Sequence, residues 1–243
     1  MTEQFEQKVR SGTEKLGIVL NGEAIAQLYR YYEMLTEKNK VMNLTAITEE
    51  NEVIIKHILD SLSLVNCLGK ESVENAKTID IGTGAGLPGM ILKIVFPGMD
   101  MTLFDSLKKR LAFLDEVILE LGLEKVRTVH GRAEDFGKNK AMRESFDLAV
   151  SRAVANMSSL SEYCLPFVKK NGVFAAYKSA DSEDEIRNAL GAIRKLGGEL
   201  EKESEFLLPY TDIPRRIVLI RKVRQTPSAY PRKAGIPAKE PLK

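Results

Sequence analysis

The sequence predicts an α/β protein with a doubly wound, seven-stranded, mostly parallel sheet, an antiparallel last strand and a helical N-terminal extension. From residue 77 onward, short β-branched runs alternate with stretches of helical periodicity, which is typical of parallel βαβ units. A glycine-rich stretch directly follows the first run, where such folds bind ligands. The last two runs are separated only by PYTDIP, so we expect an antiparallel pair that closes the sheet.

The first 70 residues are predicted to be helical. In GEAIAQLYRYYEML, apolar side chains recur at the spacing of one helix face, at Ile25, Leu28, Tyr29, Tyr32 and Leu35. Beyond the turn-like KVMNLTAIT, Thr48 is suited to cap another helix, which would end at Gly69. We therefore divide the chain into a helical extension (1–70), a cofactor-binding domain (71–224) and a basic, proline-rich tail (225–243).

The same patterns give the remaining elements. Strands are expected at 77–81, 101–105, 126–130, 146–151, 172–177, 200–208 and 216–223. Helices are expected at 88–96, 107–121, 157–170 and 183–197. The prolines of the tail exclude a regular helix or a central strand there.

Composition limits the class of protein. The 243 residues are 44% hydrophobic and 29% charged, as in ordinary globular proteins, and folding of such a chain buries roughly 70–75% of its unfolded surface. Cys67 and Cys164 lack metal-type spacing, which predicts reduced thiols, a cytoplasmic chain and no metal site. No apolar run approaches ~18 residues and the N-terminus lacks a secretory signal, so we expect no membrane span.

The net charge of +2 hides an asymmetry along the chain. Residues 215–243 carry nine Lys and Arg against one acid, Glu240, so the other 214 residues carry a net charge of −6. A basic tail on an acidic body suggests a polyanionic partner. A solvated tail that aids solubility is the alternative.

The stretch TIDIGTGAGLPG, residues 78–89, places four glycines in eight positions. Glycine lets the backbone turn sharply and approach a ligand closely. Gly84, Gly86 and Gly89 fit the dinucleotide pattern G-x-G-x-x-G, and Asp105 follows at about the expected distance. A tight strand-to-helix turn that binds nothing would also use glycines.

Two neighbours of this loop favour S-adenosylmethionine over a dinucleotide. A pyrophosphate needs N–H donors at the start of the following helix, and Pro88 removes one of them. Asp80 would repel a dianionic group, whereas it would stabilise the cationic ammonium and sulfonium of S-adenosylmethionine. We therefore predict that Asp80, Gly84 and Gly86 bind this cofactor.

Acidic residues follow the next two strands. Asp105 is placed to accept hydrogen bonds from both hydroxyls of a ribose, a role it would have with either cofactor. Glu134 and Asp135 lie in the loop after the third strand, which would face an adenine, although an ordinary polar loop would explain this pair alone. Together with the glycine loop, the acids make a more specific pattern than any one of them.

The fourth strand, FDLAVSRAVANM, is expected to end over the transferable methyl group. It lacks the Asn-Pro-Pro-aromatic motif that holds an exocyclic amine, and it lacks a cysteine that would add to a pyrimidine. A purine ring nitrogen has its own lone pair and needs only alignment, which can lower a barrier by roughly 7–11 kcal/mol. Arg152 is the candidate catalytic residue, and a salt bridge that fixes the strand end is the alternative.

Motifs along the chain resemble the ribosomal RNA small subunit methyltransferase G family, also called glucose-inhibited division protein B, which are class I (Rossmann-like) methyltransferases. The matching segments are MNLTAI (42–47), HILDSL (57–62), DIGTGAGLPG (80–89), DSLKKRLAFL (105–114), GRAE (131–134), SRAV (151–154) and YPRKAGIPAKEPL (230–242). The resemblance implies a cytoplasmic enzyme that transfers methyl from S-adenosylmethionine to N7 of guanine 527 in 16S rRNA. It also implies cofactor contacts at Gly82, Leu87, Asp105, Ser106, Leu107, Ala133, Glu134 and Arg152.

Basic residues around the pocket are expected to bind RNA phosphates, because guanine N7 is best reached in unpaired RNA. The candidates are His57, Lys108, Lys109, Arg110, Lys178, Arg232 and Lys233. A solvated helix face is the alternative for Lys108–Arg110, and a core contact is the alternative for His57. Where the family pattern has Lys-Gly, this chain has Lys178-Ser179, which leaves Lys178 available for RNA. Asp60 and Ser61 are expected to cap the extension or to brace it against the sheet.

Three functions stay open at this point. An rRNA guanine-N7 methyltransferase is favoured over a dinucleotide-dependent oxidoreductase and over a non-catalytic S-adenosylmethionine-binding protein of ribosome assembly. The expected partner is 16S rRNA, in the small ribosomal subunit or in an assembly intermediate. We expect the chain to act as a monomer.

Overall fold

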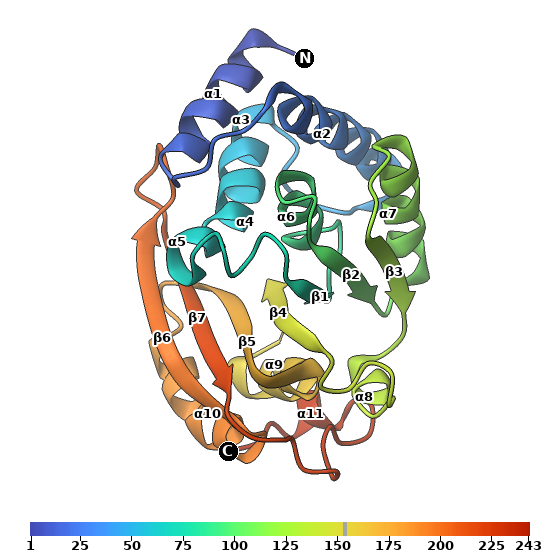
Figure 1. Cartoon of the computed structure of the whole chain (residues 1–243), viewed down its shortest axis with the longest axis vertical. Helices are drawn as coiled ribbons and strands as arrows, with labels where there is room; N and C mark the ends of the chain where they lie inside the picture. Colours follow the sequence, from blue (N-terminus) through green and yellow to red (C-terminus); the bar gives the residue numbers. More distant parts are fainter. Residues whose placement is uncertain (153–154) are drawn as a thin grey trace.

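A seven-stranded sheet forms the centre of the computed structural model, which describes residues 1–152 and 155–243 (Figure 1). Its spatial order is β3-β2-β1-β4-β5-β7-β6. Neighbours are parallel from β3 to β5, whereas β7 runs antiparallel to both β5 and β6. The strands are β1 (Lys77–Ile81), β2 (Asp100–Asp105), β3 (Val126–His130), β4 (Phe146–Arg152), β5 (Val168–Ser179), β6 (Gly198–Leu207) and β7 (Pro214–Lys222). The predicted fold class is confirmed.

Helices cover both faces of the sheet (Figure 1). The core of the first face includes side chains of α2 (Gly22–Met42), η1 (Ile54–Leu59), α4 (Asp60–Leu62), α5 (Leu64–Leu68), α6 (Gly89–Val95) and α7 (Lys108–Glu120). Further out, α1 (Glu3–Glu14) joins this core and packs on α2 and η1, and α3 (Glu50–Val53) packs on η1. The second face packs against α8 (Ala133–Phe136), α9 (Met157–Cys164), η2 (Leu165–Phe167) and α10 (Glu183–Lys195), with α11 (Ile236–Lys239) on α9. Each face therefore has its own apolar core, as a parallel sheet buried on both sides requires.

The N-terminal helices share one core with the first face of the sheet. Leu28 and Leu35 of α2 belong to the same buried cluster as Ala85 of the glycine loop. The Tyr31 hydroxyl, also fully buried, donates a 2.8 Å hydrogen bond to the Ala85 carbonyl. Asn21 starts α2 as its cap, since its side chain accepts from the amide of Ala24 at 2.8 Å. The extension thus supports the glycine loop directly.

The segment from residue 49 to 69 differs from the single α-helix that we predicted. Glu49 is its cap instead of Thr48, and its carboxylate accepts from the amide of Glu52 at 2.8 Å. Between Ile54 and Leu59 the chain widens into a π-helix, a conformation that is frequent at functional sites because it changes which side chains face a neighbour. The segment ends at Gly69, as predicted, where φ is 84°.

The helix predicted at 157–170 is shorter in the structure. α9 ends at Cys164, a single 3₁₀ turn that contains Pro166 follows, and β5 begins at Val168 instead of residue 172. Pro166 has no N–H group with which to continue the helix, which explains the early end. The extra length of β5 pairs with the start of β4, where Val168 faces Phe146.

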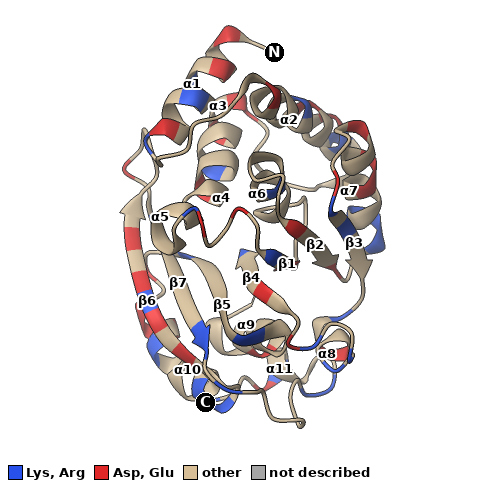
Figure 2. Cartoon of the chain, in the orientation of Figure 1, with Lys and Arg blue, Asp and Glu red and all other residues tan. Residues whose placement is uncertain are grey.

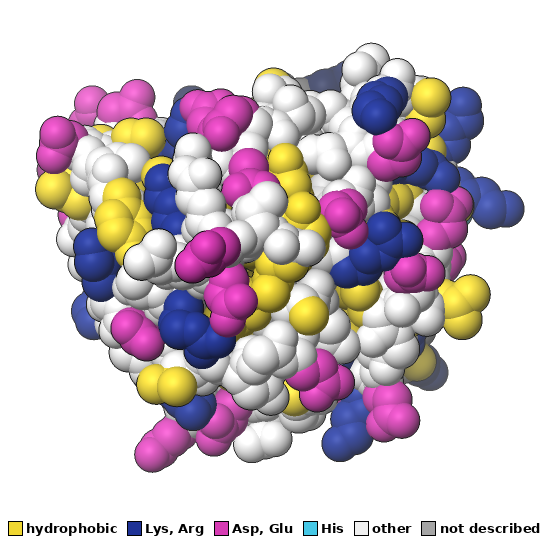
Figure 3. Space-filling model, turned by 90° about the horizontal axis from the view of Figure 1, so that it is seen from above, with side chains coloured by type: hydrophobic (Ala, Val, Ile, Leu, Met, Phe, Trp, Pro, Cys, Tyr) yellow, Lys and Arg dark blue, Asp and Glu magenta, His cyan; other side chains and the backbone are white. Residues whose placement is uncertain are grey.

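The basic C-terminal region is less free than its composition suggests. The β7 arginines pair with acids of the neighbouring strand β6, Arg216 with Glu203 and Glu205, and Arg221 with Glu201 (Figure 2). On the face over the N-terminal helices, Lys and Arg likewise lie among Asp and Glu (Figure 3). Much of the predicted charge asymmetry is therefore neutralised locally.

The tail folds back onto the second face of the sheet. The guanidinium of Arg143 donates to the carbonyls of Thr226 at 2.6 Å and Tyr230 at 2.8 Å. The Lys222 amine is fully buried and donates to Leu165 and Thr226, and burial lowers its pKa to about 8. One helical turn, α11, forms where we predicted no regular helix, because Pro237 is tolerated in a first turn.

Over residues 1–152 and 155–243, no helix is long and apolar enough to cross a membrane. In the same residues, no group of three or more His, Cys, Asp or Glu side chains is arranged to hold a metal ion.

Candidate active site

The loop between β1 and α6 has the geometry of a ligand cradle. Gly82, Gly84 and Gly86 adopt positive φ angles of 74°, 59° and 99°. A side chain at Gly84 would meet little but open space, with the carbonyl of Gly82 3.9 Å away, whereas one at Gly86 would meet Met90 at 2.8 Å. Gly84 therefore leaves room for a ligand, and Gly86 is needed for packing. Leu87, the next residue, is buried.

Asp80, which we predicted to bind the cofactor, lies beneath this loop and is fully buried. One carboxylate oxygen accepts from the Thr83 hydroxyl at 2.7 Å and from the Gly89 amide at 2.9 Å. The other oxygen has no hydrogen-bond partner among the described residues, and burial raises the pKa of Asp80 to about 6. Because Asp80 already occupies the start of α6, a pyrophosphate has no free N–H group at Gly89.

Asp105, at the end of β2, joins the loop to its neighbouring strand. Its carboxylate accepts from the Gly84 amide at 2.9 Å and from the Leu107 amide at 2.8 Å, and the side chain of Arg110 lies 3.6 Å away. A carboxylate offers about four acceptor positions, so two remain for hydroxyl donors. Ser106 and Leu107 follow on the exposed rim, and the Ser106 carbonyl lies 3.1 Å from Nε2 of His130.

The loop after β3 lies next to the loops after β1 and β2, at the carboxyl ends of these strands. Ala133 and Glu134 begin α8 and are both buried. The Glu134 carboxylate accepts from the amide of Gly235 in the C-terminal tail at 2.9 Å. β1, β2 and β3 are adjacent and parallel, so their loops lie in line at one edge.

These residues fit S-adenosylmethionine. Gly84 leaves open space beside the backbone, and Asp105 keeps acceptor positions for ribose hydroxyls. The start of α6, which a phosphate group would need, is taken by the protein's own carboxylate. When bound, the cofactor would supply an electrophilic methyl group, held at its ribose by Asp105 and at its adenine by the loop at Ala133 and Glu134.

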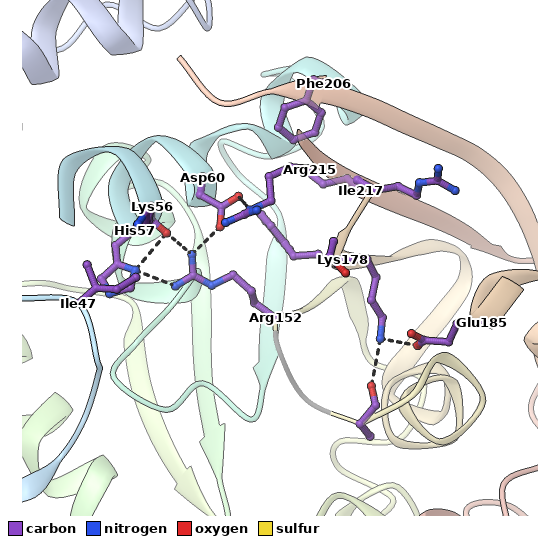
Figure 4. Close-up of a pocket in the computed structure, with 14 residues that line it drawn as sticks. Ile47, Lys56, His57, Asp60, Arg152, Lys178, Glu185, Phe206, Arg215 and Ile217 are labelled. Carbon is purple, nitrogen blue, oxygen red and sulfur yellow. Dashed lines mark hydrogen bonds and ion pairs between the residues drawn. The ribbon is translucent and has the colours of Figure 1, made fainter. Parts of the chain in front are cut away.

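A separate cavity of about 650 Å³ opens at the ends of β4 and β5 and the start of β7 (Figure 4). It is within the size range of small-ligand sites. Its lining is charged and comes from distant segments: Ile47, Lys56, His57, Asp60, Arg152, Ala155, Tyr177, Lys178, Ser179, Glu185, Phe206, Arg215, Arg216 and Ile217. None of these residues belongs to the glycine loop, so the cavity is distinct from the open space beside Gly84.

Arg152 forms a buried ion pair on the wall of this cavity. Its guanidinium donates to the Asp60 carboxylate at 2.9 Å and to the Lys56 carbonyl at 3.1 Å, and Arg215 lies 3.5 Å from the other Asp60 oxygen (Figure 4). Burial raises the pKa of Asp60, and the two arginines oppose that rise. The hydroxyl of Tyr177 donates to the Ser61 carbonyl at 2.6 Å. The expected bracing role of Asp60 and Ser61 is thereby confirmed.

His57 is held in the same wall by the π-helix. It is buried, with Nε2 2.9 Å from the Thr45 hydroxyl and Nδ1 3.0 Å from the Lys56 carbonyl. Burial, together with the nearby charge of Arg152, lowers the pKa of His57 to about 4. The imidazole is therefore neutral at pH 7. It makes core contacts and also lines the cavity.

The predicted RNA-binding residues fall into two groups. Lys108, Lys109 and Lys233 are exposed. Lys178 was expected to be available for RNA. It instead donates to Glu185 at 2.6 Å and to the Ala155 carbonyl at 3.0 Å. Arg232 is turned inward onto buried Glu162.

Sequence reasoning missed Arg215 and Arg216 as site residues. From the sequence, both residues contribute only to the basic charge of the C-terminal region. In the structure they lie near the start of β7, which pairs antiparallel with β5, so they lie beside the end of β5. The antiparallel pairing was the signal that could have found them. The last two residues of the SRAV motif, Ala153 and Val154, lie outside the described residues.

Comparison with known proteins identifies the family. Residues 24–207 match the model of the family described as rRNA small subunit methyltransferase G, or GidB. The chain belongs to this family. A relative named ribosomal RNA small subunit methyltransferase G from Alkaliphilus metalliredigens is 48% identical over 236 residues, which cover 97% of this chain and 98% of the relative. One of the same name from Thermoanaerobacter sp. (strain X514) is 50% identical and covers 95% of each chain.

Solved structures share the fold at much lower identity. TrmN from Thermus thermophilus superposes with a TM-score of 0.51 at 15% identity, covering 67% of this chain and 48% of that one. NSun6 from Pyrococcus horikoshii superposes with a TM-score of 0.51 at 16% identity, covering 69% and 52%. As a member of the rRNA small subunit methyltransferase G family, the chain uses S-adenosylmethionine as its methyl donor.

Proposed function

We propose that this protein transfers the methyl group of S-adenosylmethionine to N7 of guanine 527 in 16S rRNA. The observation that carries the proposal is that the glycine loop, with open space beside Gly84, and the cavity beside Arg152 lie at the carboxyl ends of neighbouring strands. The glycine loop and Asp105 form the cofactor side, and the cavity beside Arg152 forms the side from which a base would enter. β1 and β4 are adjacent, so the two sides meet between these strands.

The residues of the cavity would orient the base rather than activate it. Guanine N7 carries its own lone pair, so no protein group has to remove a proton before attack. Neutral His57 and ion-paired Arg152 are suited to this role, since both are fixed by hydrogen bonds to backbone carbonyls. Alignment of N7 with the methyl group then supplies most of the rate enhancement.

The charges in the cavity suit a base that becomes cationic. Arg152 pairs with Asp60, Lys178 with Glu185, and Lys56 with Glu52. Lys178 and Lys56 each have a carboxylate of their own, and Arg152 shares Asp60 with Arg215, so these acids offset much of the repulsion between the cations and the developing positive charge on guanine.

RNA outside the pocket would be bound by exposed cations. Lys108 and Lys109, at the start of α7, are exposed and follow Asp105 closely in the chain. We propose that the partner is the small ribosomal subunit or an assembly intermediate, that the chain acts in the cytoplasm, and that it acts as a monomer.

The test is methyl transfer from labelled S-adenosylmethionine to small subunits from cells that lack this enzyme. Reduction and aniline cleavage then cut the RNA at 7-methylguanine. A single enzyme-dependent stop in 16S rRNA at guanine 527 is the expected result. Cofactor binding without any stop would contradict the proposal and point to a non-catalytic assembly protein.

A further inference from the structure

The C-terminal tail contacts the cofactor side of the site, and among the described residues none of the tail lines the cavity. The amide of Gly235 donates to the carboxylate of Glu134 at 2.9 Å, and Glu134 is only 7% exposed. Glu134 lies in the loop after β3, which is the next loop along the sheet edge beyond Asp105. A ligand whose ribose binds at Asp105 therefore extends its base toward the segment that the tail holds.

Two side chains of α9 fasten the tail in place. The carboxylate of Glu162, which is fully buried, accepts from the backbone amide of Arg232 at 2.7 Å and from its guanidinium at 2.7 to 3.1 Å. The Ser159 hydroxyl donates to the Pro237 carbonyl at 2.6 Å. A bidentate Arg–carboxylate pair of this kind is geometrically specific, so the tail has one position on α9.

The tail also packs against the C-terminal end of α8. Gly137 directly follows α8, and a side chain there would lie 2.9 Å from the ring of Pro231. Arg143 holds the preceding residue, Tyr230, through its carbonyl. The segment from Ala133 to Gly137 is thus enclosed between β3 and the tail.

We propose that residues 230–240 are part of the cofactor site: they fix the Ala133–Glu134 loop and so set the affinity for S-adenosylmethionine. The inference rests on the proposed function, which makes S-adenosylmethionine the ligand of this edge. Arg232 is then a positioning residue that acts through Glu162 and Gly235, and it binds no RNA phosphate. Drawing Arg232 out toward RNA would leave the Glu162 carboxylate buried and unpaired, which is costly.

Point variants of the full chain test this by calorimetric titration with S-adenosylmethionine in the absence of RNA. Glu134→Ala removes the acceptor for the Gly235 amide and is expected to weaken binding about tenfold. Glu134→Gln keeps an acceptor oxygen for the Gly235 amide and is expected to weaken binding less than Glu134→Ala does. Arg232→Gln is expected to weaken binding. Lys243→Gln, an exposed cation of the tail outside residues 230–240, serves as the control that leaves binding unchanged.

A second measurement separates positioning from general folding. If the tail and the cofactor share one loop, coupling is reciprocal, so S-adenosylmethionine must slow amide hydrogen exchange in residues 230–240 of the unaltered protein. Unchanged exchange on binding, or wild-type affinity in both Glu134→Ala and Arg232→Gln, overturns the inference. Normal affinity in Arg232→Gln with reduced rRNA methylation would instead make the tail an RNA arm. Failure of the unaltered protein to bind would overturn the proposed function itself.

Discussion

The cofactor side and the cavity side occupy the same edge of one sheet but are built differently. On the cofactor side, the carboxylates of Asp80 and Asp105 are held by neutral backbone amides within a single stretch of chain. On the cavity side, charged side chains from the N-terminal helices, β4 and β7 hold one another in ion pairs. The first arrangement suits a small ligand of fixed shape, and the second suits entry of one base from a large, charged partner.

The largest effect is expected at the glycine loop. Gly84→Val should abolish S-adenosylmethionine binding, because the new side chain would fill the space beside the loop at a residue with positive φ. Gly122→Val is the matched control, since Gly122 also has positive φ (60°) and open surroundings but lies beyond the end of α7. Titration of both variants checks the prediction, and equal binding by the two would contradict it.

The next largest effect is expected from the buried ion pair on the cavity side. Asp60→Ala leaves Arg152 and Arg215 without their shared carboxylate and should lower the free energy of unfolding by about 3 to 5 kcal/mol. Urea denaturation measures the loss. An exposed pair, Arg187 with Glu183, provides the control, because Glu183→Ala should cost less than about 1 kcal/mol. Similar losses in both variants would argue against a buried, structural pair.

The two sides are expected to contribute to the pH dependence of stability with opposite signs. The pKa of His57 falls from 6.5 to about 4 on folding, so His57 makes stability rise with pH between about 4 and 6.5, by about 3 kcal/mol in total. The pKa of Asp80 rises from 3.8 to about 6, so Asp80 makes stability fall over nearly the same range. The free energy of unfolding of the unaltered protein should therefore change little with pH between about 4 and 6.

His57→Gln should remove the contribution of His57 to the pH dependence of stability, so that the opposite contribution of Asp80 becomes measurable. Urea denaturation of this variant at pH 4.5 and pH 7 is expected to give higher stability at the lower pH. The same pH dependence in the variant and the unaltered protein would show that His57 is not buried in its neutral form.

The smallest effect is expected at exposed cations. Lys108→Gln with Lys109→Gln should leave S-adenosylmethionine affinity unchanged and weaken RNA binding a few-fold, with a shallower dependence on salt for each phosphate that is no longer neutralised. Filter binding of the small subunit at several salt concentrations measures this. An unchanged slope would remove α7 from the RNA-binding surface.

The two sides also differ in how far the sequence predicts them. The glycine loop, Asp105 and Glu134 sit at the ends of successive strands, so local patterns place them together. Arg215 reaches Asp60 only because β7 inserts antiparallel between β5 and β6, and strand order is a long-range property that one sequence does not encode in any local pattern. The cavity therefore stayed hidden until the fold was known.

Burial was the second property that the sequence did not reveal. Arg232 and Lys178 are charged residues in a basic or polar context, for which exposure is the ordinary expectation. Both instead face acids supplied by other elements, Glu162 on α9 and Glu185 on α10. Their partners are separated from them by 70 and 7 residues, so only the second pair lies within reach of a local pattern.

The contact between the first helix and the turn before the last strand has a consequence for synthesis. In α1, the Ser11 hydroxyl lies 2.6 Å from the hydroxyl of Tyr210, which stands in the turn between β6 and β7, 199 residues later. Lys15 lies over the same ring, 3.8 Å from its centre. α1 is the first helix to be synthesised, but its contact with Tyr210 can form only after the turn between β6 and β7 has been made. A nascent chain stalled before residue 210 keeps this side of its N-terminal helix uncovered, and the fold closes only when translation is almost finished.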